Sequence, residues 1–263
     1  MPELPDVEIF KKYLDATALN QKIARVTVKN ARITRHTSPQ AIARKLKRRK
    51  LQSSRRHGKF LFGQLDKNGA AIFHFGMTGF LRYFSDKAQE PEHTRVRFDF
   101  SNGASMAYVC PRMFGEVDYT RDVDRYIAQR GLGPDALTVT WKQFKERLAG
   151  IKSSIKSALM DQTLLAGIGN VYSDEILFQA RVHPKRRVDG LSEGTLHRIY
   201  NKMKSVLNST IRYQADPRQV PKSWLLPHRG TKADCPRCGK PVQRVTINQR
   251  SAYVCPNCQR QKG

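Results

Sequence analysis

Apolar and polar residues follow two different periods along this chain. In the first half, Val96, Phe98 and Phe100 alternate with charged residues, which is typical of a half-buried β-strand. Asn102-Gly103 then predicts a hairpin turn into a second strand over residues 105–109. The period of two therefore indicates antiparallel β structure in this half.

The remaining pattern of the first 120 residues agrees with this interpretation. Val7, Phe10 and Leu14 recur at helical spacing, and Pro5 suits the first position of a helix. Together the patterns predict helices over 5–19 and 39–46, and strands over 23–28, 31–33, 60–62 and 71–75. This half is expected to be mainly antiparallel β with a leading helix.

The second half has a helical period. The breaker cluster Gly131-Leu132-Gly133-Pro134 predicts a linker between domains. Beyond it, helices are expected over 141–148, 155–160, 170–180 and 196–211, followed by a loop over 217–227. The chain is therefore expected to combine a β-rich half, a helical half and a short tail.

Composition narrows the class of protein. The chain has 263 residues, of which 39% are hydrophobic, so it can build real cores and is not expected to be disordered. No run approaches the roughly 20 apolar residues of a membrane span, and the first thirty residues lack the pattern of a signal peptide. We expect a soluble, cytoplasmic protein with no membrane partner. No oligomerisation signal is present, so a monomer is expected.

The charge balance points to a polyanionic partner. Lys and Arg number 48 against 22 Asp and Glu, which gives a formal net charge of +26. Such self-repulsion costs stability unless a polyanion compensates it, and a strongly basic domain is typical of nucleic-acid binding. A basic surface that serves solubility, or an anionic membrane, would be the alternatives. Charge alone does not separate DNA from RNA, or a binder from an enzyme.

Four of the five cysteines have the spacing of a metal site. They form two Cys-x2-Cys pairs, namely Cys235, Cys238, Cys255 and Cys258. This spacing is typical of a structural zinc ion, and the residues between the pairs can form the hairpin of a zinc ribbon. Disulfides are the alternative, disfavoured where thiols stay reduced. We expect one structural Zn²⁺, with Cys110 as a small packed residue.

Two further segments are candidates for phosphate contacts. Residues 44–59 contain nine Lys or Arg residues, most of them expected on a solvated surface. The Gly-rich run 165–170 opens a predicted helix, whose free N–H groups could hold a phosphate. A tight turn between two helices explains the same run equally well. In the ribbon, Arg244, Asn248, Gln249 and Arg250 are expected to face a phosphate backbone.

Several motifs in a fixed order resemble one enzyme family. The chain opens with PELPDVE (2–8) and continues with HFGMTG (74–79), PRMFG (111–115), LMDQ (159–162), GIGNVYSDE (167–175) and the four-cysteine ribbon containing QRS (249–251). This series resembles the formamidopyrimidine-DNA glycosylase/endonuclease VIII family of base-excision enzymes, along the whole chain.

The resemblance implies an α+β fold in three parts. These are an N-terminal two-layer antiparallel β-sandwich over 1–130, a helix–two-turn–helix domain over 131–233 and a zinc finger over 234–263. It also implies a bifunctional DNA glycosylase and abasic-site lyase of base-excision repair, whose partner is duplex DNA with damaged bases or abasic sites.

The implied chemistry centres on the amino terminus. Removal of Met1 would give Pro2 a free secondary amine, which can attack the sugar C1′ carbon. Nearby cations lower the pKa of this amine, which favours its uncharged form. Glu3 resembles the family's acid/base carboxylate, and Lys59 resembles a lysine that contacts the phosphate at the lesion and assists elimination. Without the resemblance, the same residues would be a frayed terminus with Glu3 favouring the start of the first helix.

Other matching positions imply contacts to DNA. Asn170, Arg250 and His74 resemble phosphate contacts, although His74 could also be a satisfied buried histidine. Lys156 resembles a lysine near the lesion, where neighbouring Lys152 offers an equivalent charge.

Three residues match the group that fills the gap left by an everted base. They are Met77, Arg112 and Phe114, a flexible apolar side chain, a planar cation and an aromatic wedge. The alternative is that Met77 and Phe114 belong to the core.

Two departures from the family pattern affect the substrate. Cys110 stands where an Asp commonly precedes the PRMFG motif, so Arg112 lacks its usual orienting carboxylate. The segment 215–234 differs from the form associated with recognition of 8-oxoguanine. Oxidised purines (8-oxoguanine and formamidopyrimidines) are the first expectation, and oxidised pyrimidines the alternative. A non-catalytic protein that binds lesions, or a zinc-ribbon transcription or ribosome-associated factor, would be a different class of function.

Overall fold

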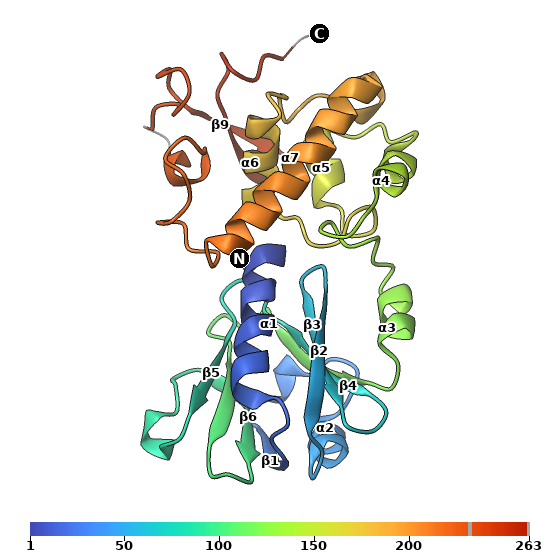
Figure 1. Cartoon of the computed structure of the whole chain (residues 1–263), viewed down its shortest axis with the longest axis vertical. Helices are drawn as coiled ribbons and strands as arrows, with labels where there is room; N and C mark the ends of the chain where they lie inside the picture. The colour runs from blue at the N-terminus through green and yellow to red at the C-terminus, as the bar shows by residue number, and fades with distance from the viewer. Residues whose placement is uncertain (231–232, 262–263) are drawn as a thin grey trace. The chain divides into compact units, whose positions relative to one another are not determined.

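The structure is a computed structural model that describes residues 1–230 and 233–261 (Figure 1). The predictions for segment 215–234 and for the finger 234–263 therefore extend in part outside the described residues. The chain forms two compact units. Unit 1 comprises Met1–Pro2 and Asp6–Arg130, and unit 2 comprises Glu3–Pro5 and Gly131–Gly263.

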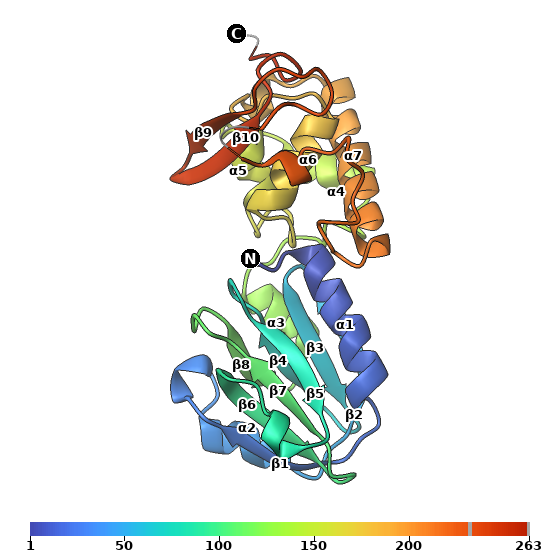
Figure 2. The same cartoon turned by 90° about the vertical axis from the view of Figure 1, so that its left-hand side faces the viewer.

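Unit 1 contains two four-stranded antiparallel sheets. One has the strand order β1 (Ile23–Val28), β6 (Thr94–Phe100), β7 (Ser105–Val109), β5 (Phe80–Phe84), and the other has the order β2 (Leu51–His57), β3 (Phe60–Leu65), β4 (Ala70–His74), β8 (Glu116–Thr120). Helices α1 (Leu4–Ala18), α2 (Pro39–Leu46) and α3 (Val123–Gln129) accompany them. Figure 2 shows the strands of unit 1 beside α1.

The alternating pattern builds the core between the two sheets. Every second residue of β6 is buried, and Phe98 of this strand packs on Phe73 of β4 with ring centroids 5.8 Å apart. Apolar residues of both sheets join in one buried cluster. The predicted two-layer β-sandwich is therefore confirmed.

One predicted strand is wrong. Residues Ala31–Ile33 form a single 3₁₀ turn (η1) instead of a strand. The side chain of Asn30 accepts a hydrogen bond from the backbone N–H of Arg32, which favours a turn over pairing in a sheet. Further short 3₁₀ turns are η2 (Lys87–Gln89), η3 (Val188–Gly190) and η4 (Leu226–His228).

Unit 2 is helical and ends in a two-stranded ribbon. Its helices are α4 (Trp141–Leu148), α5 (Ile155–Met160), α6 (Asn170–Gln179) and α7 (Glu193–Arg212), and the ribbon strands are β9 (Gln243–Ile247) and β10 (Arg250–Val254). Side chains of Thr140, Ser154 and Ser192 cap the starts of α4, α5 and α7. The starts of α4 and α5 agree with the predicted bounds, whereas α7 begins at Glu193, three residues before the predicted start at 196.

Helix α6 is central to unit 2, since its residues from Tyr172 to Phe178 are all buried. Phe178 packs with Leu225, Val242 and two of the cysteines, so the ribbon rests on this helix. No helix among the described residues is long and apolar enough to cross a membrane.

Candidate functional site

The carboxylate of Glu3 occupies the amino-terminal end of α6. Its Oε2 accepts hydrogen bonds from the backbone N–H groups of Gly169 (2.7 Å) and Tyr172 (3.2 Å), and its Oε1 accepts one from Val171 (2.8 Å). Glu3 is 1% exposed. The positive end of the helix and its free N–H groups thus stabilise a buried negative charge.

The Gly-rich run is needed for this approach. A Cβ at Gly169 would collide with the carboxyl carbon of Glu3. The prediction that these N–H groups hold a phosphate is therefore corrected, because they bind an internal carboxylate. Glycine is needed at position 169 because Glu3 approaches the backbone closely there.

Pro2 directly precedes this fixed carboxylate. It lies half-buried just before the first turn of α1, while Met1 is 50% exposed. Removal of the exposed Met1 would place an imino nitrogen next to Glu3 along the chain.

Lys59 and His74 lie at the same end of one sheet in unit 1. Phe60 pairs with His74 in the β3–β4 ladder, and Lys59 directly precedes Phe60. Burial, followed by the positive charges of Lys59, Arg130 and Arg35, lowers the pKa of His74 to about 4. The ring is thus neutral at pH 7.

In the described part of the chain, the second ring nitrogen of His74 has no hydrogen-bond partner and can bind an acceptor from outside the protein. Its Nδ1 accepts the backbone N–H of Gly76 at 3.4 Å, so the ring hydrogen is on Nε2. A neutral imidazole that donates from Nε2 can bind a phosphate oxygen.

Two loops at this end expose the predicted gap-filling residues. Met77 is 37% and Phe114 54% exposed, so the alternative that they belong to the core is wrong. Gly76 has φ +57° and packs against the backbone of Phe114 so closely that a Cβ would collide with it. The two loops therefore lie side by side.

Arg112 is exposed on the second of these loops. Its guanidinium lies over the ring of Phe114, 5.5 Å from the centroid. Cys110, as predicted, is fully buried. Among the described residues no carboxylate forms an ion pair with Arg112, so the aromatic ring is what orients this cation.

Part of the basic stretch 44–59 is used inside unit 1. Arg56 pairs with Glu8 of α1 at 2.7 Å, Arg49 pairs with Asp66, and Arg55 pairs with Asp124 at 2.8 Å. The side chain of Arg56 is only 5% exposed. These three arginines serve the fold, and the phosphate track predicted here is smaller than nine cations.

A buried ionic network fixes the start of α6 in unit 2. Lys156 Nζ donates to Asp174 Oδ1 (2.6 Å), Ser173 Oγ (2.9 Å) and the backbone oxygen of Asn170 (3.1 Å). Lys156 is 1% exposed. All three donors of this ammonium are thus used within the protein, which leaves none for direct contact with DNA.

Asp174 connects three segments of unit 2. Besides Lys156 of α5, it accepts from Arg229 Nη2 at 2.9 Å and from the backbone N–H of Tyr253 in β10 at 3.2 Å. Burial lowers the pKa of Lys156, and the charge of Asp174 opposes that change. The carboxylate therefore holds the ribbon and the loop before it against α6.

Asn170 and Arg250 both belong to unit 2. The side-chain Oδ1 of Asn170 is buried without a hydrogen-bond partner among the described residues. Because this atom is buried, it is not accessible to a phosphate, but the residue as a whole is partly exposed at the start of α6. Arg250 is exposed at the start of β10 and lines a pocket of about 220 Å³ with residues of α5.

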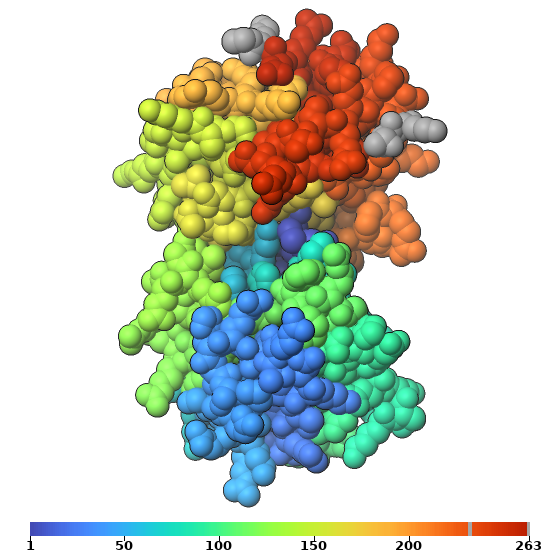
Figure 3. Space-filling view, turned by 180° about the vertical axis from the view of Figure 1, so that it is seen from behind, coloured from blue at the N-terminus to red at the C-terminus, as the bar shows by residue number. Residues whose placement is uncertain are grey.

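The tip of the ribbon is held against α5. Asn248 donates from Nδ2 to Ser157 Oγ at 2.9 Å, and Figure 3 shows the hairpin (red) beside the segment of α5 (yellow). Arg244 donates to Ser251 Oγ at 2.8 Å within the ribbon. Asn248 and Arg244 therefore shape the hairpin, on which Arg244 and Arg250 are both exposed cations.

The four cysteines fit a zinc ion. Their Sγ atoms all lie within 4.8 Å of one another, with Cys238 and Cys255 at 3.5 Å and Cys235 and Cys258 at 3.9 Å. Disulfide sulfurs lie about 2.05 Å apart, whereas tetrahedral Zn–S bonds of about 2.3 Å separate the sulfurs by nearly 4 Å. One structural Zn²⁺ fits this site, and the disulfide alternative does not.

A second group of side chains that could bind a metal ion is engaged in interactions within the protein. His36, Glu116 and Asp118 also lie close together. Glu116, however, pairs with Arg130, and Asp118 accepts the backbone N–H of His36 at 2.7 Å. This cluster is explained by internal hydrogen bonds.

The segment that departs from the family pattern packs on unit 2. Trp224 is 9% exposed and Leu225 fully buried. Glu175 accepts the backbone N–H of Leu226 at 2.7 Å and an N–H from Gln179 at 2.7 Å. Burial raises the pKa of Glu175 to about 7. The end of this segment is therefore anchored to α6.

Asp174, Glu175 and Arg229 were not singled out as site residues by the sequence analysis. The sequence contained a signal for them, because two adjacent acidic residues lie after Asn170 in a helix that is otherwise rich in apolar residues. Carboxylates in such a helix must be buried with partners. The identity of those partners required the tertiary structure.

Comparisons with known proteins cover nearly the whole chain. Three family models match: the formamidopyrimidine-DNA glycosylase N-terminal domain (residues 1–117), the H2TH domain of the same enzyme (131–221), and the zinc finger found in FPG and IleRS (235–261).

Individual relatives agree with these matches. The chain is 32% identical to a formamidopyrimidine-DNA glycosylase of Streptococcus pyogenes, with 100% of both chains covered. It is 31% identical to one of Listeria monocytogenes, covering 99% of this chain and 100% of the other.

Solved structures of Lactococcus lactis formamidopyrimidine-DNA glycosylase are also similar. One, in complex with DNA that contains N7-benzyl-Fapy-dG, has a TM-score of 0.89 at 26% identity, covering 99% of this chain and 100% of that one. Another, bound to DNA with an abasic site, has a TM-score of 0.89 at 27% identity, covering 98% and 100%.

Proposed function

The chain belongs to the formamidopyrimidine-DNA glycosylase family, and from this premise we propose that it is a bifunctional DNA glycosylase and abasic-site lyase of base-excision repair. The observation that carries the proposal is the buried carboxylate of Glu3, held by three backbone N–H groups directly beside Pro2. A binding protein has no need of such a fixed carboxylate next to a potential amine nucleophile.

The reaction begins at Pro2. After removal of Met1, the neutral imino nitrogen attacks C1′ of the damaged nucleotide, and the bond from C1′ to the base breaks as the base leaves with a proton. The ring oxygen O4′ takes a proton when the sugar opens, and the nitrogen forms an iminium ion with C1′. Glu3 is assigned to supply and remove these protons and to stabilise the cation.

Strand cleavage follows from the iminium ion. It makes the C2′ proton acidic, so loss of that proton expels the 3′ phosphate by β-elimination. A second elimination expels the 5′ phosphate, and water then hydrolyses the remaining imine to release Pro2. Lys59 is assigned to the phosphate at the lesion, where its charge stabilises the leaving group.

The DNA contacts are assigned from exposure and donors. His74, Asn170 and Arg250 bind phosphates, and Met77, Arg112 and Phe114 fill the space of the everted base. Lys156, which has no donor left, is reassigned from contact with DNA to positioning of Asn170. Zinc, when bound, supplies folding energy to the ribbon that presents Arg250.

The proposed substrates are oxidised purines. The named relatives are formamidopyrimidine-DNA glycosylases, and one structural neighbour is bound to a formamidopyrimidine lesion. Because segment 215–234 differs from the expected form, oxidised pyrimidines are the alternative to be tested directly.

The functional divisions follow the family matches. We assign the sandwich with Pro2 to 1–130, the helical domain to 131–233 and the finger to 234–263, in a monomer. The proposed location is the cytoplasm, with the nucleoid as the place of action, because DNA is the substrate.

Borohydride trapping tests this proposal. The protein is incubated with duplexes that carry 8-oxoguanine, an oxidised pyrimidine or a bare abasic site, and covalent complexes are separated by electrophoresis. The wild type should trap on the 8-oxoguanine duplex, and P2G should trap on none. Intact mass should show that Met1 is absent.

Each other outcome has a defined meaning. Trapping on the abasic duplex alone would refute the glycosylase assignment and leave the lyase. Preferential trapping on the pyrimidine lesion would replace the substrate assignment. Retention of Met1 together with unchanged trapping would refute the role of Pro2.

A further inference from the structure

A basic pocket of about 520 Å³ lies at the carboxyl end of α6. It is lined by Asn257, Cys258 and five arginines, which are Arg181, Arg186, Arg198, Arg237 and Arg260. They come from the turn after α6, from α7 and from both cysteine pairs of the ribbon. Helix α6 has 10 residues, so at about 1.5 Å per residue the pocket is roughly 15 Å from Asn170 along the axis. The surface assigned to the lesion does not include it.

The arginines of this basic pocket are not held in ion pairs with described carboxylates, although the charge of Arg237 interacts with the buried Glu175. Within residues 1–230 and 233–261, none of the five forms an ion pair and no carboxylate lines the pocket. Nearby arginines outside the pocket differ, since Arg187 pairs with Asp189 and Arg229 with Asp174. Five like charges around one hollow repel one another. A four-thiolate zinc centre, to which Cys258 of the lining belongs, would offset two of these charges, and an anion from outside the pocket would remove more of the cost.

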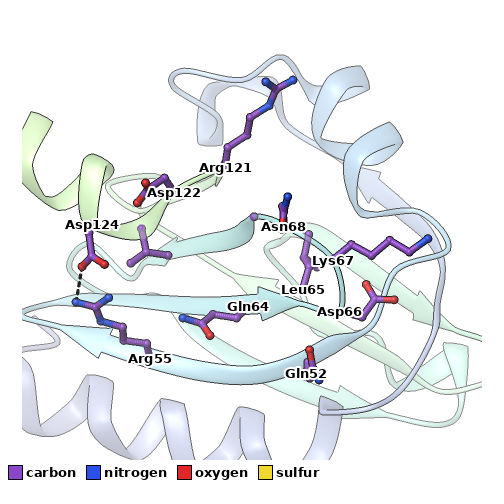
Figure 4. Close-up of a pocket in the computed structure, with 12 residues that line it drawn as sticks. Gln52, Arg55, Gln64, Leu65, Asp66, Lys67, Asn68, Arg121, Asp122 and Asp124 are labelled. Carbon is purple, nitrogen blue, oxygen red and sulfur yellow. Dashed lines mark ion pairs between the residues drawn. The ribbon is translucent and has the colours of Figure 1, made fainter.

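Another pocket of the molecule provides a contrast. It has a volume of about 450 Å³ and lies on unit 1 around β2 and β3. Figure 4 shows Asp124 facing Arg55 across one end of it, with Asp66 and Asp122 also in its lining. Mixed charges of this kind give no preference for an anion, whereas the described lining of the basic pocket contains five arginines and no carboxylate.

Several guanidinium groups of the basic pocket are held in place. Arg198 donates to the backbone oxygen of Ala180 (2.9 Å), and Arg237 donates to that of Phe178 (3.2 Å), both at the negative end of α6. Arg186 donates to the backbone oxygen of Gly190 at 3.2 Å. Because these side chains are already ordered, a ligand need not meet the full entropy cost of fixing them.

The walls of the basic pocket are also connected to each other. Gln259 is fully buried, donates to the backbone oxygen of Val182 at 2.9 Å and accepts from the N–H of Cys255 at 3.1 Å. This side chain joins the second cysteine pair to the turn after α6. The spacing of Arg260 relative to Arg181 and Arg186 is thus set by the folded unit.

We propose that the basic pocket binds several adjacent phosphates of a second DNA segment while the lesion site holds the first. The pocket offers planar donors suited to phosphate oxygens and no aromatic surface for a base. Recognition is therefore independent of sequence, and the protein can pass from one duplex to another without full release. This inference goes beyond the proposed enzymatic activity and needs only that the protein binds DNA.

A two-duplex binding experiment tests the proposal. The full-length, zinc-loaded protein is first saturated with a short duplex that contains a non-cleavable abasic analogue. A second, fluorescently labelled and undamaged short duplex is then titrated, and its anisotropy is measured at several salt concentrations. For the wild type we expect a second binding event with a Kd of roughly 10⁻⁶–10⁻⁴ M.

The test variant is R186Q/R260Q, and the matched control is R147Q/R212Q. The control removes the same charge from exposed positions of unit 2 outside the pocket. Each phosphate contact contributes about 0.9 to the salt slope, or roughly 8-fold in affinity at 0.1 M salt. The test variant should therefore bind the second duplex roughly 60-fold more weakly, with a slope lower by about 1.8. If the double variant does not fold, the single variant R260Q takes its place as the test variant.

Further measurements separate this proposal from the enzymatic one. Cleavage of a lesion duplex should be the same in the test and control variants. The absence of a second binding event in the wild type, or equal losses in both variants, would overturn the proposal. Inorganic tripolyphosphate is titrated in a parallel arm. If tripolyphosphate binds to the wild type but not to R186Q/R260Q, and no second duplex binds to either, the assignment to DNA is wrong.

Discussion

The strongest prediction about stability concerns Asp174→Asn. In the folded protein, Asp174 is fully buried and pairs with Lys156, whose side chain is 1% exposed, and with Arg229, whose side chain is 16% exposed. The substitution keeps the shape of the side chain and removes its charge. Lys156 is then a buried cation that has lost its paired carboxylate and keeps only the longer-range attraction of Glu3.

The expected cost follows from that asymmetry. Removal of one partner from a buried ion pair costs about 3–5 kcal/mol, because the other charge stays desolvated and unpaired. Lys156→Met should cost less, since Asp174 then still pairs with Arg229. The double variant should be less destabilised than the sum of the two single variants, because it removes the buried cation together with the carboxylate.

Tryptophan fluorescence is the suitable assay. The chain has 2 Trp residues, Trp141 and Trp224, and both pack in the core of unit 2. Urea unfolding followed by this signal therefore reports on unit 2. With an m-value of about 2 kcal/mol/M, a loss of about 4 kcal/mol lowers the midpoint by about 2 M urea.

A matched control is Asp189→Asn. Asp189 pairs with Arg187 at 2.6 Å in the same unit, but both side chains are well exposed to water. We expect no measurable shift for this variant, because exposed ion pairs contribute little. If D174N shifts the midpoint no more than D189N, or if the double variant is fully additive, the argument from the buried charge is refuted.

Three other predictions concern pH, zinc and the exposed wedge. The pKa of Glu175 rises from 4.5 to about 7 on folding, so its contribution to stability is complete below pH 4.5 and is lost as the pH rises through 7. The loss is about 3 kcal/mol, and Glu175→Gln should flatten this part of the Trp-monitored stability profile. Removal of zinc by a chelator should unfold the ribbon and weaken DNA binding, measured by metal release and anisotropy; unchanged binding by metal-free protein would contradict the structural role. Phe114→Ala, at a side chain 54% exposed, should change the unfolding midpoint little but slow excision of a lesion in single-turnover assays. Equal rates for F114A and the wild type would exclude the wedge.

Local patterns were sufficient for the elements with local signals. The bounds predicted for α4 and α5 from the helical period agree with the structure, in which Thr140 and Ser154 cap the starts of these helices. Strand β2 was not, because it lies in the basic stretch and its polar side chains hide the period of two. Strands β5 and β8 and helix α3 were likewise not predicted. For η1, a side-chain cap at Asn30 prevailed over strand propensity.

The sequence by itself determined the zinc ligands, the family motifs and therefore the identity of the candidate nucleophile, because these depend on residue type and on short spacings. Only the tertiary structure decided that Glu3 binds the start of α6, 166 residues away along the chain. The same holds for Lys156, which the fold buries against Asp174, and for the arginines that converge at the other end of α6. Burial and pairing of charges depend on which distant segments meet, and the packing of the core determines those meetings.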